Sequence, residues 1–408
     1  MGPDDLASLE AGAAEIVPVD GLAHKLGLGR PLRVKLGVDP TAAEITLGWA
    51  VVLHKLRQFQ DAGHVAVLIV GDFTARVGDP SGRSDTRPRL SAEVVRGYAD
   101  RLLHQFWRIL DRERTEVRFN AEWLEGLGME EILHLTASTT VARMLERDDF
   151  AKRYAEGHPI SLMEFLYPLL QGWDSVAVEA DVELGGNDQL FNLLVGRDLQ
   201  RDEGQEPQVA LTMPLLVGTD GVKKMSQSLG NYIGISDPAD EMFGKLTRVK
   251  DELIPEYRRL TLDFFTDPAE ADRVAAGLAN GSLEPWEEKR RLAREVVDRY
   301  HGVGAGQLAE TRFLAATHEP APDAGQVMRI PAEAVKEGRV WIPRLLTELR
   351  MAPSTSEARR LIEGGGVRLD GAVVEDPATE VDLRELEGKV LQVGSKRWRH
   401  GIRLMLPG

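Results

Sequence analysis

The chain has 408 residues, of which 43% are hydrophobic and 28% charged, a composition typical of a globular protein with two or three domains. It contains no cysteine, which excludes disulfides, thiolate metal ligands and cysteine nucleophiles and fits a reducing cytoplasm, where we expect the protein. The sequence contains no run of about 18 apolar residues, the length that would predict a membrane span. The acidic N-terminal segment also lacks the basic stretch and apolar core of a secretory signal.

The charge is unevenly distributed. The net charge is −15, which argues against a protein coated with nucleic acid. Residues 335–408 hold 13 Lys and Arg against 11 Asp and Glu, a net charge of +2, so the remainder carries −17. A contact with a polyanion is therefore expected at the C-terminal end.

The first 75 residues predict a βαβ unit. Residues 32–38 alternate like a strand, 48–62 have apolar residues at helical spacing, and 65–73 form a β-branched run typical of a strand buried on both faces. A Gly/Pro/Ser loop follows. Strand, helix and buried strand in this order predict a parallel sheet with right-handed crossovers.

The middle of the chain is mainly helical. Segment 181–201 predicts strand, Gly-rich turn and helix, 209–218 a second buried strand, and 219–234 a polar, basic surface loop. Helices are predicted over about 92–112, 121–128, 130–147 and 160–173, and through most of 238–316.

A Pro/Ala-rich stretch, 316–325, reads as a linker before a compact C-terminal piece. That piece predicts helix, Ser/Thr turn, helix, Gly turn, strand and hairpin. Ser354 or Ser356 is expected to cap the second of these helices.

Several stretches together resemble a bacterial tyrosyl-tRNA synthetase, a class I aminoacyl-tRNA synthetase, nearly from end to end. They are KLGVDPTAAEITLGW, GDFTARVGDPSGRS, YPLLQGWDSVAVEADVELGGNDQLFN and KKMSQSLGNYIG, followed by a C-terminal piece that resembles an S4 RNA-binding domain. Each stretch alone is a weak signal, and their combination is highly specific.

The resemblance implies an α/β fold made of a Rossmann-type parallel-sheet catalytic domain, a helical domain and a small α+β S4-like domain. The expected boundaries are 1–232 for the catalytic domain, 233–318 for the helical anticodon-binding-like domain, 319–334 for the linker and 335–408 for the S4-like domain. It also implies ATP-dependent activation of tyrosine to tyrosyl-adenylate and transfer to tRNA(Tyr), with Mg²⁺ arriving with ATP. We expect no tightly bound cofactor, no protein metal site and a homodimer.

Two motifs of the family handle phosphates, and both differ here. In the first, His-(Ile/Leu)-Gly-His at a helix start, Gly48 remains but the histidine positions hold Thr46 and Trp49. In the second, Lys-Met-Ser-Lys-Ser, the second lysine is Gln227. Removing one preorganised donor typically costs a few kcal/mol of transition-state stabilisation, so activation should be far slower unless something compensates.

The substrate residues are carried over by motif position. The resemblance implies a catalytic group, a nucleotide-binding group and an amino-acid-binding group. The catalytic positions are Lys224, Ser226, Thr46 and Gln227; the nucleotide positions are Asp39, Thr41, Gly48, Trp49, Asp188 and Met225; the amino-acid positions are Asp79, Tyr167, Gln171, Asp174 and Gln189. Asp79, Tyr167 and Gln171 would hold the α-ammonium and Asp174 the phenol hydroxyl.

Two unusual charges lie near these positions. Arg76 stands where relatives usually have methionine, and Glu179 stands where they usually have arginine. We interpret them as a paired charge swap beside the site, an interpretation that requires the two side chains to meet.

Contacts with RNA are expected in the C-terminal piece, where basic residues surround Trp398. The candidates are Arg359, Arg360, Lys396, Arg397 and Arg399. The alternative is a solvated basic surface.

Two functions stay open at this point. The chain is either a tyrosine-activating ligase with weakened phosphate chemistry, or a repurposed paralogue. Such a paralogue would use an amino acid, adenylate or charged tRNA in a specialised aminoacyl transfer, or would act only as a binding protein. Trp49 likewise either contacts substrate or simply packs where substrate would otherwise lie.

Overall fold

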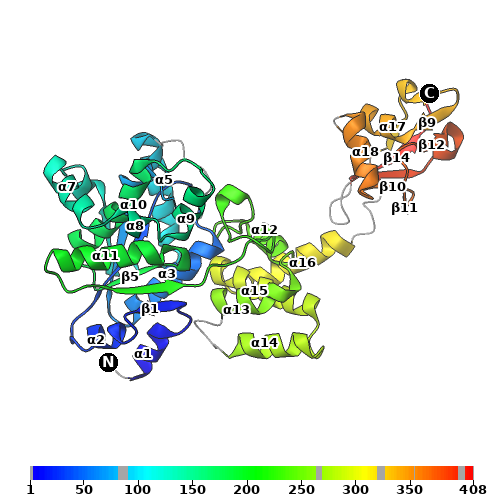
Figure 1. The fold of residues 1–408 in the computed structure, drawn as a ribbon. Coiled ribbons are helices and arrows are strands. Elements are labelled where there is room, and N and C mark those ends of the chain that lie inside the picture. Colours follow the sequence, from blue (N-terminus) through cyan, green and yellow to red (C-terminus); the bar gives the residue numbers. More distant parts are fainter. Residues whose placement is uncertain are drawn as a thin grey trace. The chain divides into compact units, whose positions relative to one another are not determined.

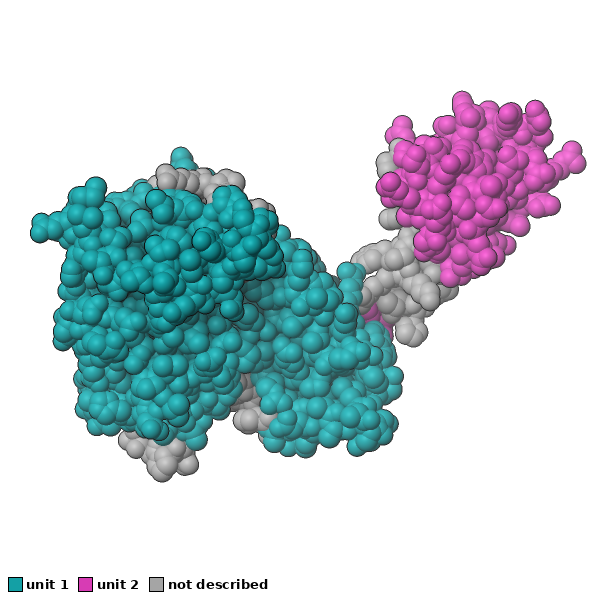
Figure 2. Space-filling model, viewed as in Figure 1, with its two compact units in different colours: residues 1–309 teal, residues 310–408 magenta. Residues whose placement is uncertain are grey.

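The computed structural model describes residues 3–80, 91–262, 269–318, 327–352, 354–393 and 400–407. The chain forms two compact units, Met1–Ala309 and Glu310–Gly408 (Figure 2). Among the described residues, no helix is long and apolar enough to cross a bilayer.

The first unit is organised around a six-stranded sheet with the order β1-β6-β5-β2-β3-β4. Every neighbouring pair is parallel except β1 and β6. The strands are β1 (Glu15–Val17), β2 (Arg33–Val38), β3 (Val65–Val70), β4 (Thr115–Phe119), β5 (Val182–Gly186) and β6 (Val209–Met213). The parallel α/β fold predicted from the sequence is thus confirmed.

The order in which the chain adds strands to this sheet reverses between the parallel neighbours β2 and β5. From β2 the chain adds β3 and β4 on one side, and from β5 it adds β6 on the other. Right-handed crossovers place helices on opposite faces in the two halves. Ligands bind at the carboxyl ends of the strands beside such a reversal, so the cavity is expected next to residues that follow β2 and β5.

Helices cover the sheet and continue beyond it (Figure 1). Those of the sheet-bearing part are α1 (Pro3–Glu10), α2 (Gly21–Leu26), α3 (Leu47–Asp61), α4 (Thr74–Val77), α5 (Ala92–Phe106), α6 (Ala121–Leu124), α7 (Met129–Ala137), α8 (Val141–Met144), α9 (Asp148–Ala155), α10 (Leu162–Ala177) and α11 (Leu190–Asp202). The helices that follow are α12 (Ala239–Leu246), α13 (Ile254–Thr261), α14 (Glu270–Ala279), α15 (Pro285–His301) and α16 (Ala305–His318). Short 3-10 turns occur at Arg112–Arg114, Asn187–Gln189, Gln227–Leu229 and Asp251–Leu253.

Helix α3 contacts both the sheet and the later helices. Its buried face, including Val51 and Leu56, packs against the sheet. Nε2 of His54 lies 3.0 Å from the Tyr300 hydroxyl of α15. Burial lowers the pKa of His54 to about 3, so this ring is neutral at physiological pH. The predicted boundary at residue 232 stays a prediction, because the described residues on both sides of it belong to the first unit.

Three details differ from the sequence predictions. The predicted helix 130–147 is divided between α7 and α8, and the predicted helix 92–112 ends at Phe106. The edge strand β4 was not predicted. Its residues are all half-buried and include Glu116 and Arg118, so they lack the apolar alternation that marks a strand.

The second unit is a small α+β structure with its own apolar core. It contains a five-stranded sheet, β11-β10-β13-β14-β7, and a three-stranded sheet, β12-β9-β8. Its elements are β7 (Val327–Arg329), β8 (Val335–Lys336), β9 (Arg339–Trp341), α17 (Ile342–Glu348), α18 (Thr355–Glu363), β10 (Val367–Leu369), β11 (Ala372–Val373), β12 (Glu380–Asp382), β13 (Val390–Val393) and β14 (His400–Met405), with 3-10 turns at Ala332–Ala334 and Leu383–Leu386. Ser354 caps α18 by accepting a hydrogen bond from the Glu357 amide, as one of the two predicted alternatives requires. Strand β7 lies within residues predicted as linker.

Candidate active site

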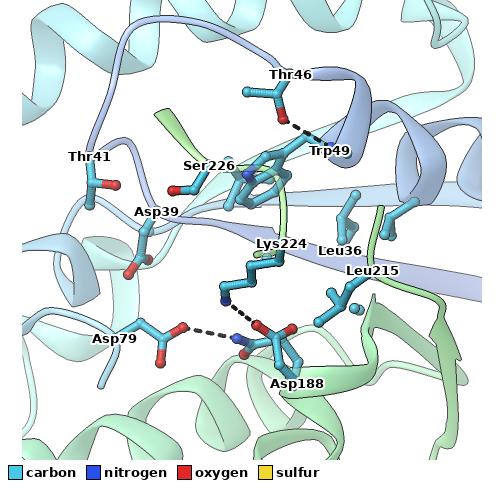
Figure 3. Close-up of a pocket in the computed structure, with 18 of the residues that line it drawn as sticks. Leu36, Asp39, Thr41, Thr46, Trp49, Asp79, Asp188, Leu215, Lys224 and Ser226 are labelled. Atoms are coloured by element: carbon cyan, nitrogen blue, oxygen red, sulfur yellow. Dashed lines mark hydrogen bonds and ion pairs between the residues drawn. The ribbon is translucent and has the colours of Figure 1, made fainter. Parts of the chain in front are cut away.

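A cavity of about 1090 Å³ opens at the carboxyl ends of β2 and β5 (Figure 3). The residues that the resemblance assigns to catalysis, nucleotide and amino acid all line it. They are Asp39, Thr41, Thr46, Gly48, Trp49, Asp79, Tyr167, Gln171, Asp174, Asp188, Gln189, Lys224, Met225, Ser226 and Gln227. The fold thus brings together side chains that are far apart in the sequence.

The two altered motifs meet through backbone contacts. The Leu47 amide donates to the Ile233 carbonyl at 2.8 Å, and the Ile235 amide donates to the Ile45 carbonyl at 2.9 Å. A Cβ on Gly48 would lie 3.4 Å from Cβ of Met225, at van der Waals contact, so the helix start and the loop are close neighbours.

Thr46 serves helix α3 itself. Its side chain is only 1% exposed, and its hydroxyl accepts the backbone N–H of Trp49 at 3.3 Å (Figure 3). Thr46 is therefore the N-cap of α3. That amide, which an anion at a helix start would use, is already taken within the helix.

The remaining phosphate-side groups are also engaged. Nζ of Lys224 lies 2.5 Å from a carboxylate oxygen of Asp188, and the Gln227 amide donates to the Glu44 backbone carbonyl. The indole of Trp49 is 40% exposed at the cavity. Lys223 also lines the cavity, and no Arg or His does so among the described residues.

The loop that carries Lys224 is held by Asn231. The Asn231 side chain accepts the Ser226 amide at 2.8 Å and donates to Asp220 at 2.8 Å and to the Lys224 carbonyl at 3.1 Å. Asn231 was not predicted from the sequence. Its position directly after Gly230 in a polar loop was the available signal.

A continuous chain of hydrogen bonds joins the nucleotide and amino-acid sides of the cavity. It begins at Asp39, whose carboxylate accepts from the Tyr167 hydroxyl at 2.9 Å and from the Thr74 hydroxyl at 2.7 Å. The Asn120 amide donates to Thr74 at 2.9 Å and to Asp174 at 3.2 Å. Gly71 leaves room for this chain, because a Cβ there would lie 2.1 Å from Oδ1 of Asp39, far inside contact range.

Trp123 completes the chain, since its indole N–H donates to the other oxygen of Asp174 at 2.9 Å. Thr74, Asn120 and Trp123 were not predicted from the sequence. Asn120 and Trp123 follow β4, so recognition of that strand would have placed them at the carboxyl edge of the sheet.

Two carboxyl groups of this chain have strongly altered pKa values. Burial raises the pKa of Asp39 to about 7, against hydrogen bonds from Thr74 and Tyr167 that favour its charged form. Burial also raises the pKa of Asp174 to about 7, against the opposing charge of Lys35. Burial raises the pKa of Tyr167 as well, which keeps its hydroxyl a proton donor.

The ammonium-binding candidates form a second cluster. Oδ2 of Asp79 accepts from the Gln189 amide at 2.9 Å. Gln171 donates to Glu183 at 3.2 Å, and Glu183 lies 2.9 Å from Nζ of the buried Lys35. Buried ion pairing beneath the cavity thus supports the amides that line it.

The interpretation of Arg76 and Glu179 as a charge pair is wrong. Arg76 pairs with Glu125 at 2.8 Å, and Glu179 is exposed in a turn with a φ of 48°. The turn that ends α10 directs Glu179 to solvent.

Of the five RNA-binding candidates, two lie within the described residues and three lie outside them. Arg359 and Arg360 are exposed on α18, with the Arg359 guanidinium 5.0 Å from the centre of the Trp341 ring. Lys396, Arg397 and Arg399 lie outside the described residues. Within the described part of the chain, no group of three or more His, Asp or Glu could hold a metal ion.

Comparisons with known proteins agree with this geometry. The family described as tRNA synthetases class I (W and Y) matches residues 28–316, and the S4 domain matches 340–385. The tyrosine–tRNA ligase of Moorella thermoacetica is 52% identical over 96% of this chain and 94% of its own length. That of Geobacter sulfurreducens is 48% identical over 97% of this chain and 98% of its own.

A solved structure has the same fold. Tyrosyl-tRNA synthetase from Archaeoglobus fulgidus, complexed with L-tyrosine, superimposes with a TM-score of 0.62 at 22% identity, covering 75% of this chain and 98% of the other. Matches to the family over most of the chain, together with relatives of this identity, place it in one group of enzymes. The chain belongs to the tyrosyl-tRNA synthetase family of class I aminoacyl-tRNA synthetases.

Proposed function

We propose that the cavity binds tyrosine and the adenosine part of tyrosyl-adenylate, and that the chain transfers tyrosine to tRNA while activating it with ATP only slowly. The observation that carries this proposal is the division of the cavity. Its amino-acid end keeps a connected set of polar groups, whereas its phosphate end keeps Lys224 but lacks the two histidines and the second lysine that the family uses.

At the amino-acid end, the ligand would lie between two carboxylates. Asp79 would receive the α-ammonium with Tyr167 and Gln171, and Asp174 would accept the phenol hydroxyl. The donors from Asn120 and Trp123 hold the Asp174 carboxyl in one orientation, which supports recognition of a hydroxyl at a fixed distance. Gln189 would lie beside the ligand carboxylate.

At the nucleotide end, adenosine would lie against Gly48 and Met225, where the chain approaches closely. Asp188 would bind the ribose, and Asp39 and Thr41 would face the α-phosphate side. Binding of ribose by Asp188 would compete with its ion pair to Lys224, which releases the lysine toward the phosphate.

The charge balance explains the slow activation. The leaving pyrophosphate gains negative charge, and removal of one preorganised donor typically costs about 3 to 4 kcal/mol of transition-state stabilisation. The family's two histidines and second lysine are Thr46, Trp49 and Gln227 here, of which Thr46 and Gln227 bind backbone groups of the chain. Mg²⁺ would arrive with ATP and would offset part of this loss.

One observation favours a second function, transfer from a preformed activated amino acid. The indole of Trp49 is exposed at the helix start, where the triphosphate would lie. A flat aromatic surface suits a nucleoside better than a polyanion. A paralogue of this kind would accept tyrosyl-adenylate or the end of a charged tRNA without making the adenylate itself.

Pyrophosphate exchange that depends on tyrosine and ATP tests the proposal. We expect weak exchange in the unmodified protein and a strong increase in the variant Thr46→His, Trp49→His, Gln227→Lys. The matched control adds Lys224→Gln to that variant, which should abolish the gain. Exchange at the rate of an ordinary family member in the unmodified protein would refute the proposed loss.

Calorimetry and transfer assays separate the two functions. Binding of tyrosine without exchange, but with transfer from synthetic tyrosyl-adenylate to tRNA, favours the paralogue. Failure to bind tyrosine refutes the first function, and failure both to bind tyrosine and to transfer it from tyrosyl-adenylate refutes both functions. The exposed Arg359 and Arg360 of the S4 domain support a role of this domain in tRNA contact.

We also propose a homodimer formed through the first unit. Large apolar side chains are exposed along residues 129–162, with Leu162 81% exposed and Tyr154 and Met129 also highly exposed. Gathered into one patch, such side chains would favour burial against a partner. The partner expected is a second copy of this chain.

A further inference from the structure

Two buried polar residues lie behind the amino-acid end of the cavity without lining it. Arg147 precedes α9 and Asn192 belongs to α11, and both are almost fully buried. Neither was predicted from a motif. Both touch the groups that would bind the ammonium of the substrate.

The contacts form a closed ring. Arg147 donates to Oδ1 of Asn192 at 3.0 Å and lies 3.5 Å from Oδ1 of Asp79. The Asn192 amide nitrogen donates to Gln171 at 2.9 Å and to Gln189 at 3.0 Å. Gln189 returns to Asp79, to which it donates at 2.9 Å.

Arginine fixes the direction of every hydrogen bond in this ring. A carboxamide can turn over and exchange its donor and acceptor ends, so its orientation is set by its partners. A guanidinium only donates and stays charged. Asn192 must therefore present its oxygen to Arg147 and its nitrogen to the two glutamines.

The consequence reaches the carboxylate. Because Gln189 presents its oxygen to Asn192, its nitrogen must point to Asp79, which only accepts when ionised. If Asn192 turned over, Gln189 would direct its oxygen at the Asp79 carboxylate. Two acceptors in contact would repel and would displace Asp79 from its position.

We infer that Arg147 is a positioning residue that sets the polarity of this amide ring and so holds Asp79 ready for the substrate ammonium. The inference rests on the proposed function, in which Asp79 receives that ammonium. Asp149, 2.8 Å from Nε of Arg147, balances the guanidinium charge. The effect of Arg147 is therefore on orientation, and it does not require direct contact with the ligand.

A ligand pair isolates the ammonium in the test. Tyramine and 4-propylphenol have the same shape, but only tyramine carries an ammonium, and neither carries a carboxylate. Their dissociation constants are measured by ligand-observed NMR for the unmodified full-length protein and for Arg147→Met. Tyrosine is measured beside them by calorimetry.

We expect Arg147→Met to weaken tyramine and tyrosine by about tenfold or more, the effect of a lost buried hydrogen-bond partner. Binding of 4-propylphenol should change less than about threefold. Arg147→Lys, which keeps an obligate donor, should recover part of the loss. Arg143→Met is the matched control, because Arg143 is exposed and pairs with Glu146 at the surface.

A second variant covers a failure of Arg147→Met to fold. Asn192→Asp accepts from Arg147 but offers nothing to the glutamines, so both amides should turn over and tyramine should weaken selectively. Equal losses for tyramine and 4-propylphenol, or unchanged tyramine binding, overturn the inference alone. If the unmodified protein does not bind tyrosine, the proposed function fails and the inference fails with it.

Discussion

The buried ion pair beneath the cavity allows a quantitative test of how much its charges contribute to the stability of the first unit. Lys35 and Glu183 are 0% and 1% exposed, and Nζ of Lys35 lies 2.9 Å from Glu183. Lys35 also donates to the Ser175 hydroxyl at 2.7 Å and to the Gln171 carbonyl at 2.9 Å. The change Lys35→Met removes the cation and leaves the carboxylate in place.

The expected cost follows from the burial. An uncompensated charge in such a site typically costs about 3 to 5 kcal/mol, out of roughly 5 to 15 kcal/mol of total stability. Glu183 keeps neutral donors from Ser175 and Gln171, which places the expected loss for Lys35→Met near the lower figure. Adding Glu183→Gln removes the unpaired charge, so the double variant should regain about 1 kcal/mol or more relative to Lys35→Met.

Urea unfolding followed by tryptophan fluorescence measures this difference. Five of the seven tryptophans lie in residues 1–309, so the signal reports mainly on the first unit. Arg201→Met is the control, because Arg201 and its partner Asp198 are both exposed and such pairs contribute less than about 1 kcal/mol. A double variant less stable than Lys35→Met alone would show that the charge was not the cause.

Three further predictions follow from the cavity and the surface. Because burial raises the folded pKa of Asp39 and Asp174 to about 7, above the value of about 4 in an unfolded chain, the folded state holds extra protons between these values. The free energy of unfolding should therefore fall as the pH rises from about 4 to 7, and Asp174→Asn should flatten that slope in urea titrations. Trp123→Phe removes one donor to Asp174 and should weaken tyrosine roughly fivefold or more with little effect on phenylalanine, measured by calorimetry. Leu162→Asp should convert the proposed dimer into a monomer in analytical ultracentrifugation, because it places a charge in an apolar contact.

Each of these predictions has a control or an outcome that contradicts it. An unchanged slope in Asp174→Asn contradicts the assigned pKa. Trp107→Phe, at a tryptophan whose ring packs against Arg112 instead of bonding to Asp174, should leave the binding of both amino acids unaffected. Val303→Asp, at a fully exposed position in the helical part, should not alter the sedimentation of the protein.

The sequence predicted the fold where its patterns were strong. Residues 65–70 are a largely β-branched run and residues 48–62 have apolar side chains at helical spacing, and both elements lie close to where they were expected. Strand β4 was missed because an edge strand buries little and alternates weakly. The break near Ala137 was missed because helical spacing continues through it.

The site was predictable in its lining but not in its support. Asp79 and Asp174 could be assigned to the cavity because each lies within a stretch of sequence that resembles the family. Asn120, Trp123 and Arg147 come from segments without a motif, and their partners are tens of residues away in the sequence. Only the three-dimensional arrangement identifies such residues.

The cap at the start of α3 also bears on how this protein could evolve. Threonine is a good N-cap and histidine is not, so a return to histidine at Thr46 would cost the helix about 1 kcal/mol. A mutation that restored one phosphate contact would thus first lower stability, and the benefit would need further changes at Trp49 and Gln227. At this position, the stability of helix α3 and the affinity for phosphate therefore favour different residues, and threonine serves the helix.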